Sequence, residues 1–406
     1  MPLGNCFRHA ALACAISTAL VTTGFGPAAA DAGFRKWIQD FYGTAAKSGI
    51  TRKTYNAVFD GITDVDQQVI EKANYQPEFS SEIWDYLDAR VTKFTVAKGQ
   101  EMRQKYKRWL DVIERRYGVD RDVLLAIWSI ETIYGDYLTR PDSTHHLGQA
   151  LATLAYKDKR RAKFARTQLI AALKIVQNGD IPASQLRGSW AGAMGHTQFI
   201  PTSYQAYAVD FDRNGRRDIW SSIPDALATA ANLLARNGWQ SGETWGYEVV
   251  LPGGRKFPGG SMSLSKWASI GVVRANGKPF PRPSDKAELK VPDGREGPAF
   301  LMTKNFFVIK RYNNADKYAM AVGLLADQIA GYGGLVRDWN RPFTRLTFDE
   351  TQELQKRLSV MGYYDGKIDG KIGEGSRGAI KAFQSRMGLT PDGHPSKEVL
   401  SNLRRQ

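Results

Sequence analysis

The stretch Asp120–Gly135, with the sequence DRDVLLAIWSIETIYG, predicts a helix that is buried on nearly every side. Asp120 is expected to cap its N-terminus, because a side-chain oxygen there can accept a free backbone N–H. Gly135 is expected to end it. Almost every position between them is apolar, which is typical of a buried helix. Glu131 is then a single acid in apolar surroundings. Such surroundings disfavour the ionised carboxylate and favour a general acid. The alternative from this helix alone is a structural Glu131, satisfied by a buried arginine or by backbone donors.

Length and charge leave several function classes open. The chain has 406 residues, enough for two or three domains, and a formal net charge of +15. A basic surface favours polyanions, whether nucleic acid, anionic lipid or an acidic polymer. Composition alone does not choose among these partners.

Residues 1–30 are expected to be a secretory signal peptide. Arg8 precedes an apolar run, Ala10–Val21, and Ala28–Ala30 supplies a cleavage site of small residues. Arg8 is the only Lys, Arg, Asp or Glu of this segment, so the mature chain keeps a charge of +14. Both cysteines, Cys6 and Cys14, lie within it, so the mature chain is expected to have no disulfide and no thiol chemistry. Lipidation at Cys14 is disfavoured by its poor context but stays open, and the expected compartment is the periplasm.

The rest of the chain divides into a large unit, residues 31–338, a linker, residues 339–346, and a small helical unit, residues 347–406. Helices or helical stretches are expected over Gly33–Asp60, Glu82–Tyr117, Leu147–Ala155, Asp158–Asn178, Tyr204–Val209, Pro224–Asn237 and Asp316–Gly331. Tyr247–Leu251 and Phe306–Ile309 are expected to be strands. Between them, the Gly/Pro-rich segment Pro252–Pro298 is expected to form an inserted lobe.

An acidic loop follows the expected helix at Tyr204–Val209. Four side chains with oxygen atoms have the spacing of an EF-hand calcium loop: Asp210, Asp212, Asn214 and Asp218. Gly215 stands at the sixth position, where that loop has glycine. Arg217 and Ser221 depart from that pattern, and Asp225 is a candidate for the closing ligand. The alternative is a solvated turn whose acids pair with the neighbouring arginines: Arg213, Arg216 and Arg217. A structural calcium ion is therefore one reading, and no cofactor is required otherwise.

Four further segments form an ordered series: Ser129–Thr132, Gly188–Pro201 (GSWAGAMGHTQFIP), Tyr207–Asp212 and Arg311–Asn314. Together they resemble the lytic murein transglycosylase B family over roughly residues 33–338. The resemblance implies a mainly α protein with a lysozyme-like helical catalytic domain and a small β-containing inserted lobe.

The C-terminal unit carries a second resemblance. Leu354-Gln355, Gly362-Tyr363, Asp369-Gly370, Phe383-Gln384 and Asp392-Gly393 have the spacing of a peptidoglycan-binding domain of the three-helix type. Ile372 and Ser376 stand where Phe and Thr are more usual. The two resemblances imply the same partner, the glycan strands of peptidoglycan, and no nucleic acid. They leave open a peripheral association with the outer membrane or cell wall.

The first resemblance also implies a mechanism with one carboxyl group. Glu131 would protonate the oxygen between N-acetylmuramic acid and N-acetylglucosamine, and then take a proton from the C6 hydroxyl as a 1,6-anhydro ring closes. The substrate contacts that it implies are Ser189, Gln198, Tyr312, Asn313, Tyr318, Arg160 and Arg161. For the two arginines, a solvated helix face is the alternative. A goose-type lysozyme hydrolase and a non-catalytic wall-binding scaffold remain as other functions.

Overall fold

The computed structural model describes residues 31–74, 82–140, 142–253, 256–370 and 372–406. The expected signal peptide, with Cys6 and Cys14, lies outside them. The helices of the large unit are α1 (Ala32–Lys47), α2 (Arg52–Phe59), α3 (Gln67–Asn74), α4 (Ile83–Arg90), α5 (Lys93–Lys105), α6 (Lys107–Tyr117), α7 (Arg121–Thr132), η2 (Asp136–Thr139), α8 (Leu147–Lys157), α9 (Ala162–Gln177), η3 (Ala183–Gln185), α10 (Pro201–Tyr207), α11 (Ile223–Arg236), α12 (Leu264–Ser269), α13 (Lys304–Ile309) and α14 (Asp316–Ile329). Within these residues, no helix is both long and apolar enough to span a bilayer.

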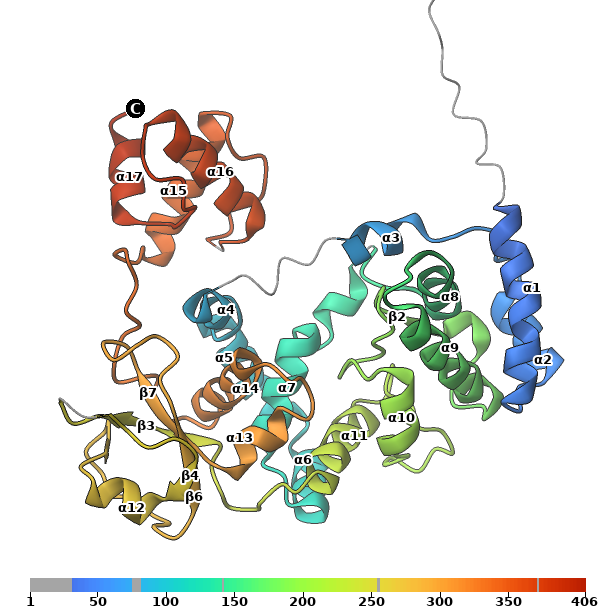
Figure 1. The fold of residues 1–406 in the computed structure, drawn as a ribbon, viewed down its shortest axis with the longest axis horizontal. Coiled ribbons are helices and arrows are strands. Elements are labelled where there is room, and N and C mark those ends of the chain that lie inside the picture. The colour runs from blue at the N-terminus through green and yellow to red at the C-terminus, as the bar shows by residue number, and fades with distance from the viewer. Residues whose placement is uncertain (1–30, 75–81, 141, 254–255, 371) are drawn as a thin grey trace, which may run out of the picture.

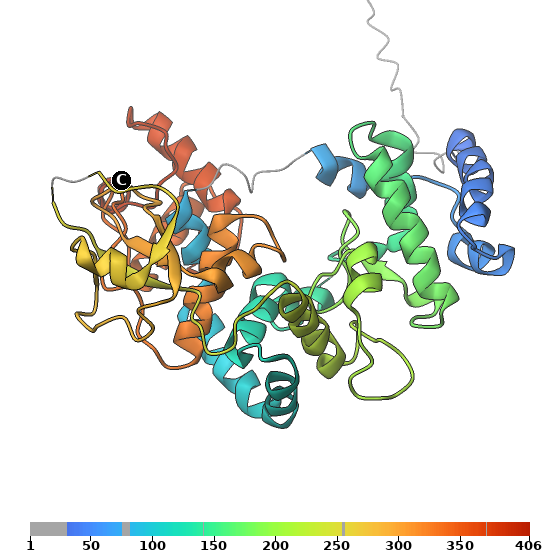
Figure 2. The same cartoon turned by 60° about the horizontal axis from the view of Figure 1, so that its bottom comes forward.

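Helix α7 lies in the middle of the large unit and packs against α14, α5 and α11 (Figure 1). On one side of it, α1, α2, α8 and α9 form a helical lobe, and on the other side lie α4, α14 and the sheet. Figure 2 shows the same separation after rotation. The buried side of α7 includes Leu124, Leu125 and Ile127, all fully buried. The mainly α fold expected from the sequence is confirmed.

The sheet forms the expected inserted lobe. Its strands are β3 (Gly246–Val250), β4 (Ser261–Ser263), β5 (Val273–Arg274), β6 (Lys286–Lys290) and β7 (Ala299–Met302), in the antiparallel order β4-β6-β7-β3-β5. A separate two-stranded pair joins β1 (His145–His146) to β2 (Arg187–Gly188). The lobe has its own core around the fully buried Trp267.

Several expected elements differ from the structure, among them Gly33–Asp60, which is divided into α1 and α2. Phe306–Ile309 is helical, within α13, rather than a strand; short apolar runs fit both periods. The stretch Glu82–Tyr117 is divided into α4, α5 and α6, since Thr92 and Thr95 form a capping box that starts a new helix at Lys93. Helix α9 begins only at Ala162, so the basic residues 159–161 precede it.

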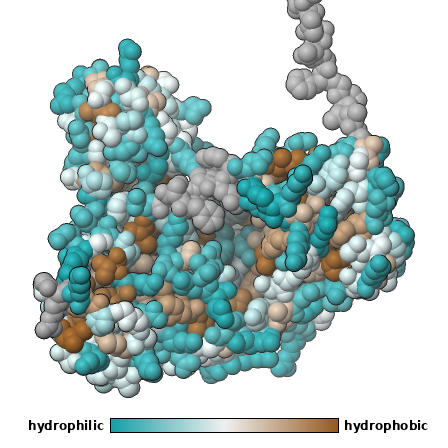
Figure 3. Space-filling view, viewed as in Figure 1, coloured by the Kyte–Doolittle hydropathy of each residue, from teal (hydrophilic) through white to brown (hydrophobic). Residues whose placement is uncertain are grey.

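The C-terminal unit contains α15 (Phe348–Val360), α16 (Glu374–Arg386) and α17 (Lys397–Arg404). Leu354, Leu358, Ile380 and Phe383, the residues whose spacing indicated a separate core, are all fully buried. The unit projects from the rest of the molecule, and the face drawn in Figure 3 is mainly hydrophilic over both units. This unit therefore has its own hydrophobic core.

The segment between the two units contacts both. Trp339 packs on Phe300 of the sheet lobe, with ring centroids 6.2 Å apart. Arg341 forms an ion pair of 3.0 Å with Asp88 on α4. Leu346 already belongs to the C-terminal core. A further ion pair of 2.6 Å joins Arg377 on α16 to Asp85 on α4 (side chains 26% and 15% exposed), so helix α4 carries most of the ionic contact between the units.

Candidate active site

Glu131 lies in the last turn of α7 and is half-buried. The hydroxyl of Tyr318, on α14, donates a hydrogen bond of 2.6 Å to its Oε1. Tyr318 is 2% exposed, so this donor is fixed by packing. The two residues are 187 positions apart in sequence, and the packing of α14 on α7 brings them together.

A second tyrosine extends this group. The rings of Tyr312 and Tyr318 stack with centroids 6.4 Å apart. The Tyr312 hydroxyl donates to the carbonyl oxygen of Thr197. Burial, and then the charge of Glu131, raises the pKa of both tyrosine hydroxyls well above the ordinary value. Both therefore remain protonated and act as donors. Asn313, which follows Tyr312, is exposed.

The backbone directly after Glu131 is strained, and the helix ends earlier than the sequence indicated. Helix α7 stops at Thr132 rather than Gly135. Ile133 and Tyr134 have φ of 54° and 56°, a left-handed conformation that is costly for a β-branched or bulky residue. Strained backbone of this kind concentrates at functional sites. Here it turns the chain sharply away one residue after the helix ends.

Asp120 caps α7 as expected, since its side chain accepts from the backbone N–H of Asp122 at 2.8 Å. Asp122 is a second acid in this helix, which the sequence reading overlooked. It is buried and paired with Arg103 at 2.8 Å. Burial, and then the charge of Asp120, raises its pKa to about 6. Asp122 lies at the opposite end of α7 from Glu131, so it adds no second carboxyl at this site.

The glycine-rich segment 188–201 forms a folded loop that returns on itself. Met194 and Phe199 form an antiparallel bridge. Ser189 Oγ accepts from the backbone N–H of Ala193 at 3.0 Å. Gln198 has a φ of 51°, and its Nε2 donates to the carbonyl oxygen of Gly195 at 2.8 Å. Ser189 and Gln198 thus lie at the two ends of one loop.

This loop joins the Glu131 region through neighbours of Gln198. The carbonyl oxygen of Thr197 accepts from Tyr312, and the ring of Phe199 meets Tyr312 edge-on at 5.3 Å. The part of the loop that contains Gln198 therefore contacts Tyr312, whose ring stacks on Tyr318, the donor to Glu131.

Arg160 and Arg161 have a different setting. Arg161 is paired with Asp158 at 2.5 Å, donates to the carbonyl oxygen of Ala73, and lies 5.6 Å from the ring of Trp190. Arg160 is exposed and lines a hollow of about 420 Å³ together with Lys157 and Lys159. Arg161 thus approaches the loop at Trp190, whereas Arg160 faces solvent.

Sequence reasoning missed the residues that attach the loop to α7. Trp128 Nε1 donates to Nδ1 of His196 at 3.1 Å, and Thr132 Oγ1 donates to the carbonyl oxygen of His196 at 2.7 Å. Burial lowers the pKa of His196 to about 4, so its ring is neutral near pH 7. The available signal was the i, i+4 spacing of Trp128 and Thr132, which places both on one helix face beside Glu131.

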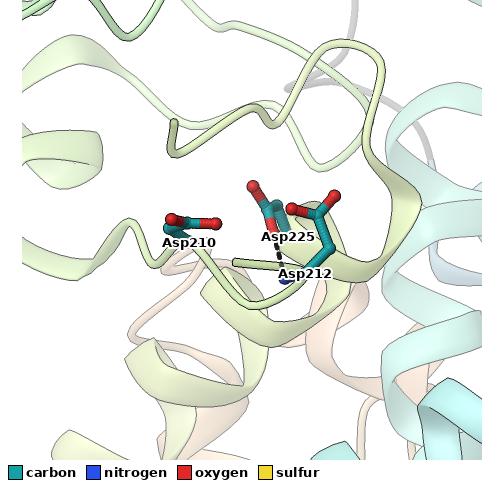
Figure 4. Close-up of side chains that lie close together, drawn as sticks. All are labelled: Asp210, Asp212 and Asp225. Atoms are coloured by element: carbon teal, nitrogen blue, oxygen red, sulfur yellow. Dashed lines mark hydrogen bonds between the residues drawn. The ribbon is translucent and has the colours of Figure 1, made fainter. Parts of the chain in front are cut away.

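The acidic loop brings three carboxylates together. Asp210, Asp212 and Asp225 have oxygens within 4.8 Å of one another (Figure 4). Asp225 is fully buried and accepts three backbone N–H groups, from Phe211 at 2.7 Å, Asp212 at 3.1 Å and Asp218 at 2.9 Å. Burial is the main cause that raises the pKa of Asp225, and the charge of Asp212 adds to it. Asp225, the candidate for the closing ligand, thus lies beside Asp210 and Asp212.

The other two expected ligands have different contacts. Asp218 accepts from the backbone N–H groups of Trp220 and Ser221, at 2.9 Å and 2.8 Å, and does not join the carboxylate group. Asn214 Oδ1 accepts from the backbone N–H of Arg216 at 3.0 Å. Arg217 pairs with Asp180 instead of the loop acids. Among the described residues, no lysine or arginine forms an ion pair with Asp210 or Asp212.

Comparisons with known proteins agree with this architecture. The family described as Transglycosylase SLT domain matches residues 33–327, and a family of peptidoglycan binding domains matches residues 349–403. Membrane-bound lytic murein transglycosylase B of Escherichia coli K12 is 30% identical over 250 residues, which span 60% of this chain and 66% of that protein.

Two solved structures are similar over most of the fold. SltB3 from Pseudomonas aeruginosa, solved in complex with NAG-NAM-pentapeptide, is 42% identical, with a TM-score of 0.72 over 91% of this chain and 99% of that chain. The Escherichia coli lytic transglycosylase Slt35, solved in complex with calcium, is 26% identical, with a TM-score of 0.58 over 74% and 93% of the two chains. The chain therefore belongs to the transglycosylase SLT domain family and carries a C-terminal peptidoglycan-binding domain.

Proposed function

We propose that the protein is a lytic transglycosylase that cleaves the β-1,4 bond between N-acetylmuramic acid and N-acetylglucosamine in peptidoglycan. The observation that carries this proposal is the placement of Glu131. Its carboxyl lies at the end of a buried helix and accepts a hydrogen bond from the hydroxyl of Tyr318. It lies beside the loop that contains Gln198. Membership of the SLT family supports the same reaction.

In this mechanism Glu131 acts first as an acid and then as a base. Its proton goes to the glycosidic oxygen as the bond to C1 of the muramic acid residue breaks. The substrate's acetamido oxygen stabilises the cationic C1. The carboxylate of Glu131, which Tyr318 stabilises by hydrogen bonding, then takes the proton of the C6 hydroxyl as that oxygen bonds to C1. Water does not attack, so a second carboxylate is not needed.

The surroundings of Glu131 are consistent with a single acid. Two-carboxylate glycosidases hold their acids about 5–9.5 Å apart on either side of the scissile bond. Asp136, the nearest acid in sequence, is exposed on η2, beyond the left-handed residues that end the helix. Ser189 and Gln198 would bind the glycan from the loop, Tyr312 and Asn313 from the segment before α14, and Arg160 and Arg161 from the turn before α9.

Product analysis tests the reaction. Purified sacculi are digested with the wild-type protein, the released muropeptides are separated, and their masses are measured by mass spectrometry. We expect 1,6-anhydro ends, which are lighter than reducing ends by one water. Reducing ends alone would assign a lysozyme-like hydrolase instead. Binding to sacculi with no soluble product would assign a wall-binding scaffold.

We also propose that the acidic loop binds a structural calcium ion through Asp210, Asp212 and Asp225. Their side chains fit a hard cation, because three carboxylates converge without a cationic partner among the described residues. Calcium would relieve the repulsion that contributes to the raised pKa of Asp225. The ion would order the loop, and no step of the reaction runs through it.

Calorimetric titration with calcium tests this second proposal. We expect one site in the wild-type protein and none in Asp210→Ala, with magnesium as the competing ion. Asp218→Asn is the matched control, since Asp218 lies outside the carboxylate group and should leave binding nearly unchanged. Equal calcium binding by the wild type and Asp210→Ala would place the ion elsewhere.

The proposed location is the periplasm, with glycan strands as the partner. The N-terminal pattern of residues 1–30 and the substrate of this reaction support it. Cell fractionation of a full-length tagged chain, with and without Ala28–Ala30, tests export and cleavage. Retention in the cytoplasm of both forms would contradict the proposal.

A further inference from the structure

The glycine-rich loop is held at both ends by one short segment that follows the acidic loop. Trp220 Nε1 donates to the carbonyl oxygen of Arg187 at 3.0 Å, just before Ser189. The backbone N–H of His196 donates to the carbonyl oxygen of Ile219 at 2.9 Å. The approach is close, since a Cβ on Gly195 would come within 2.3 Å of that same carbonyl oxygen. Segment 219–220 therefore fixes the loop from outside the site.

His196 also contacts the catalytic helix. Its ring accepts from Trp128 Nε1, and its carbonyl oxygen accepts from Thr132, the residue after Glu131. A Cβ on Gly135 would lie 2.6 Å from its Cε1, so the chain that leaves α7 passes directly against the ring. His196 is thus the point where α7, the loop and segment 219–220 meet.

The hydrogen-bonding roles of the ring are fixed by its partners. An indole nitrogen can only donate, so Nδ1 of His196 carries no hydrogen. In the neutral ring the hydrogen is then on Nε2. The ring therefore accepts from α7, and the backbone N–H of the same residue donates to segment 219–220.

We propose that His196 is a positioning residue for the cleavage reaction. It sets the position of Gln198 relative to Glu131, because its ring accepts from Trp128 and its backbone N–H donates to Ile219. Gln198 is only two residues further along and is held in a left-handed conformation, so a shift at His196 passes directly to it. This inference rests on the proposed function of Glu131.

The test compares two replacements of His196 on soluble glycan fragments. His196→Leu keeps the bulk but removes the ring acceptor for Trp128 Nε1. His196→Gln supplies an amide oxygen that can accept from Trp128 Nε1. We expect kcat of His196→Leu to fall about 10- to 100-fold with a change in KM of less than about threefold, since a displacement near 1 Å costs on that order. His196→Gln should recover kcat to within about threefold of the wild type.

His146 supplies a matched control. It is half-buried, its Nδ1 accepts from the backbone N–H of Gln149 at 3.4 Å, and its Nε2 lies 3.3 Å from the carbonyl oxygen of Ala183. Among the described residues, its ring forms no hydrogen bond with α7. His146→Leu should lower the melting temperature as His196→Leu does, with kcat close to the wild type. An equal fall in kcat in both leucine variants would mean a general loss of structure and would overturn the proposal.

Thr132 gives a second, independent variant. Thr132→Val is isosteric and removes the hydrogen bond to the His196 carbonyl oxygen together with the one from the backbone N–H of Gly135, whereas Thr132→Ser retains both. We expect kcat to fall about tenfold for valine and to stay near the wild type for serine. Wild-type kcat in the folded His196→Leu and Thr132→Val variants would overturn the positioning role. A wild type without anhydro products would instead contradict the reaction itself, so the two failures are distinguishable.

Discussion

Two glutamates, one in each unit, show how surroundings decide what a carboxyl group can do. Glu131 is half-buried and accepts a hydrogen bond of 2.6 Å from the hydroxyl of Tyr318. Glu353, on α15, accepts from Arg404 Nε at 3.0 Å and Arg357 Nε at 2.8 Å. These two guanidinium groups, Arg404 first, lower the pKa of Glu353 to about 2. Glu131 is thus held by an uncharged donor, whereas the two guanidinium groups keep Glu353 ionised.

The same contrast extends to other acids of the two units. In the catalytic unit, burial raises the pKa of Asp122 to about 6 and that of Asp327 to about 7. In the C-terminal unit, hydrogen bonds from Thr347 and Lys397 lower the pKa of Glu350 to about 2. Burial thus raises the pKa of Asp122 and Asp327 in the catalytic unit, whereas hydrogen-bond donors lower that of Glu350 and Glu353 in the C-terminal unit.

The largest expected effect is that of Glu131→Gln. The amide keeps the shape and can still accept from Tyr318 but cannot transfer a proton, so we expect cleavage of soluble glycan fragments to fall by a factor of at least about 10²–10⁴. The melting temperature should change little. Glu353→Gln is the matched control and should leave the rate unchanged. Comparable losses in the two variants would remove the distinction between the two glutamates.

A smaller loss is expected for Tyr318→Phe. This change deletes the hydroxyl that donates to Glu131 and keeps the ring that stacks on Tyr312. One hydrogen bond to a charged group contributes about 1.5–3 kcal/mol, so kcat should fall about 10- to 100-fold. Steady-state kinetics on a defined glycan fragment measures the change. Tyr363→Phe, in the C-terminal unit, should leave kcat unaltered, and a wild-type kcat for Tyr318→Phe would show that Glu131 does not depend on this donor.

The buried acids predict how stability depends on pH. Asp327 accepts from Trp245 Nε1 at 2.9 Å, and its pKa rises from 3.8 to about 7 on folding, mainly through burial. Between these two values the unfolded chain is ionised at this residue while the folded chain is protonated. Unfolding thus releases a proton, and the free energy of unfolding should fall as pH rises from 3.8 to 7, by at most about 1.4 kcal/mol per pH unit from this group.

Asp327→Asn should flatten that slope and raise stability at pH 7. All ten tryptophans precede residue 347, so tryptophan fluorescence during urea unfolding reports on the catalytic unit and its lobe. Glu353→Gln should leave this transition unchanged at each pH. An unaltered slope in Asp327→Asn would mean that Asp327 is ionised in the folded chain.

Sequence patterns correctly predicted the features that interactions between neighbouring residues determine. The cap at Asp120 and the C-terminal core of Leu354, Leu358 and Phe383 followed from side-chain chemistry and helical spacing, and the structure confirms them. The end of α7 at Thr132 did not follow, because a non-glycine residue, Ile133, adopts the left-handed conformation that ends the helix. The strand predicted at Phe306–Ile309 was wrong since four apolar residues cannot distinguish the two periods.

The site itself could be reached from sequence only in part. Glu131 was identifiable from an acid within an apolar helix. Tyr312 and Tyr318 were reached only through family resemblance, because no spacing rule connects residues so distant in sequence. His196 and Trp128 were missed, since their role depends on a tertiary contact between two segments that each have an ordinary sequence.

The smallest effect on chemistry is expected from removal of the C-terminal unit. Residues 347–406 have a separate core, and their donors keep Glu350 and Glu353 ionised. A chain ending at Pro342 keeps Trp339 on the sheet lobe and the pair of Arg341 with Asp88. It loses the pair of Arg377 with Asp85, but such a solvent-accessible pair contributes only about 0–1 kcal/mol. Its rate on soluble fragments should therefore stay within about twofold of the full-length rate.

On intact sacculi the same shortened chain should bind more weakly and release less product at low enzyme concentration, because the tether that raises local concentration is lost. A second chain ending at Asp338 sharpens the boundary. It also removes Trp339, which is 9% exposed and packs on the buried Phe300, so it should unfold at a lower temperature than the chain ending at Pro342. Equal sacculus binding by the full-length and shortened chains would remove the anchoring role. Equal melting temperatures of the two shortened chains would place Trp339 outside the catalytic core.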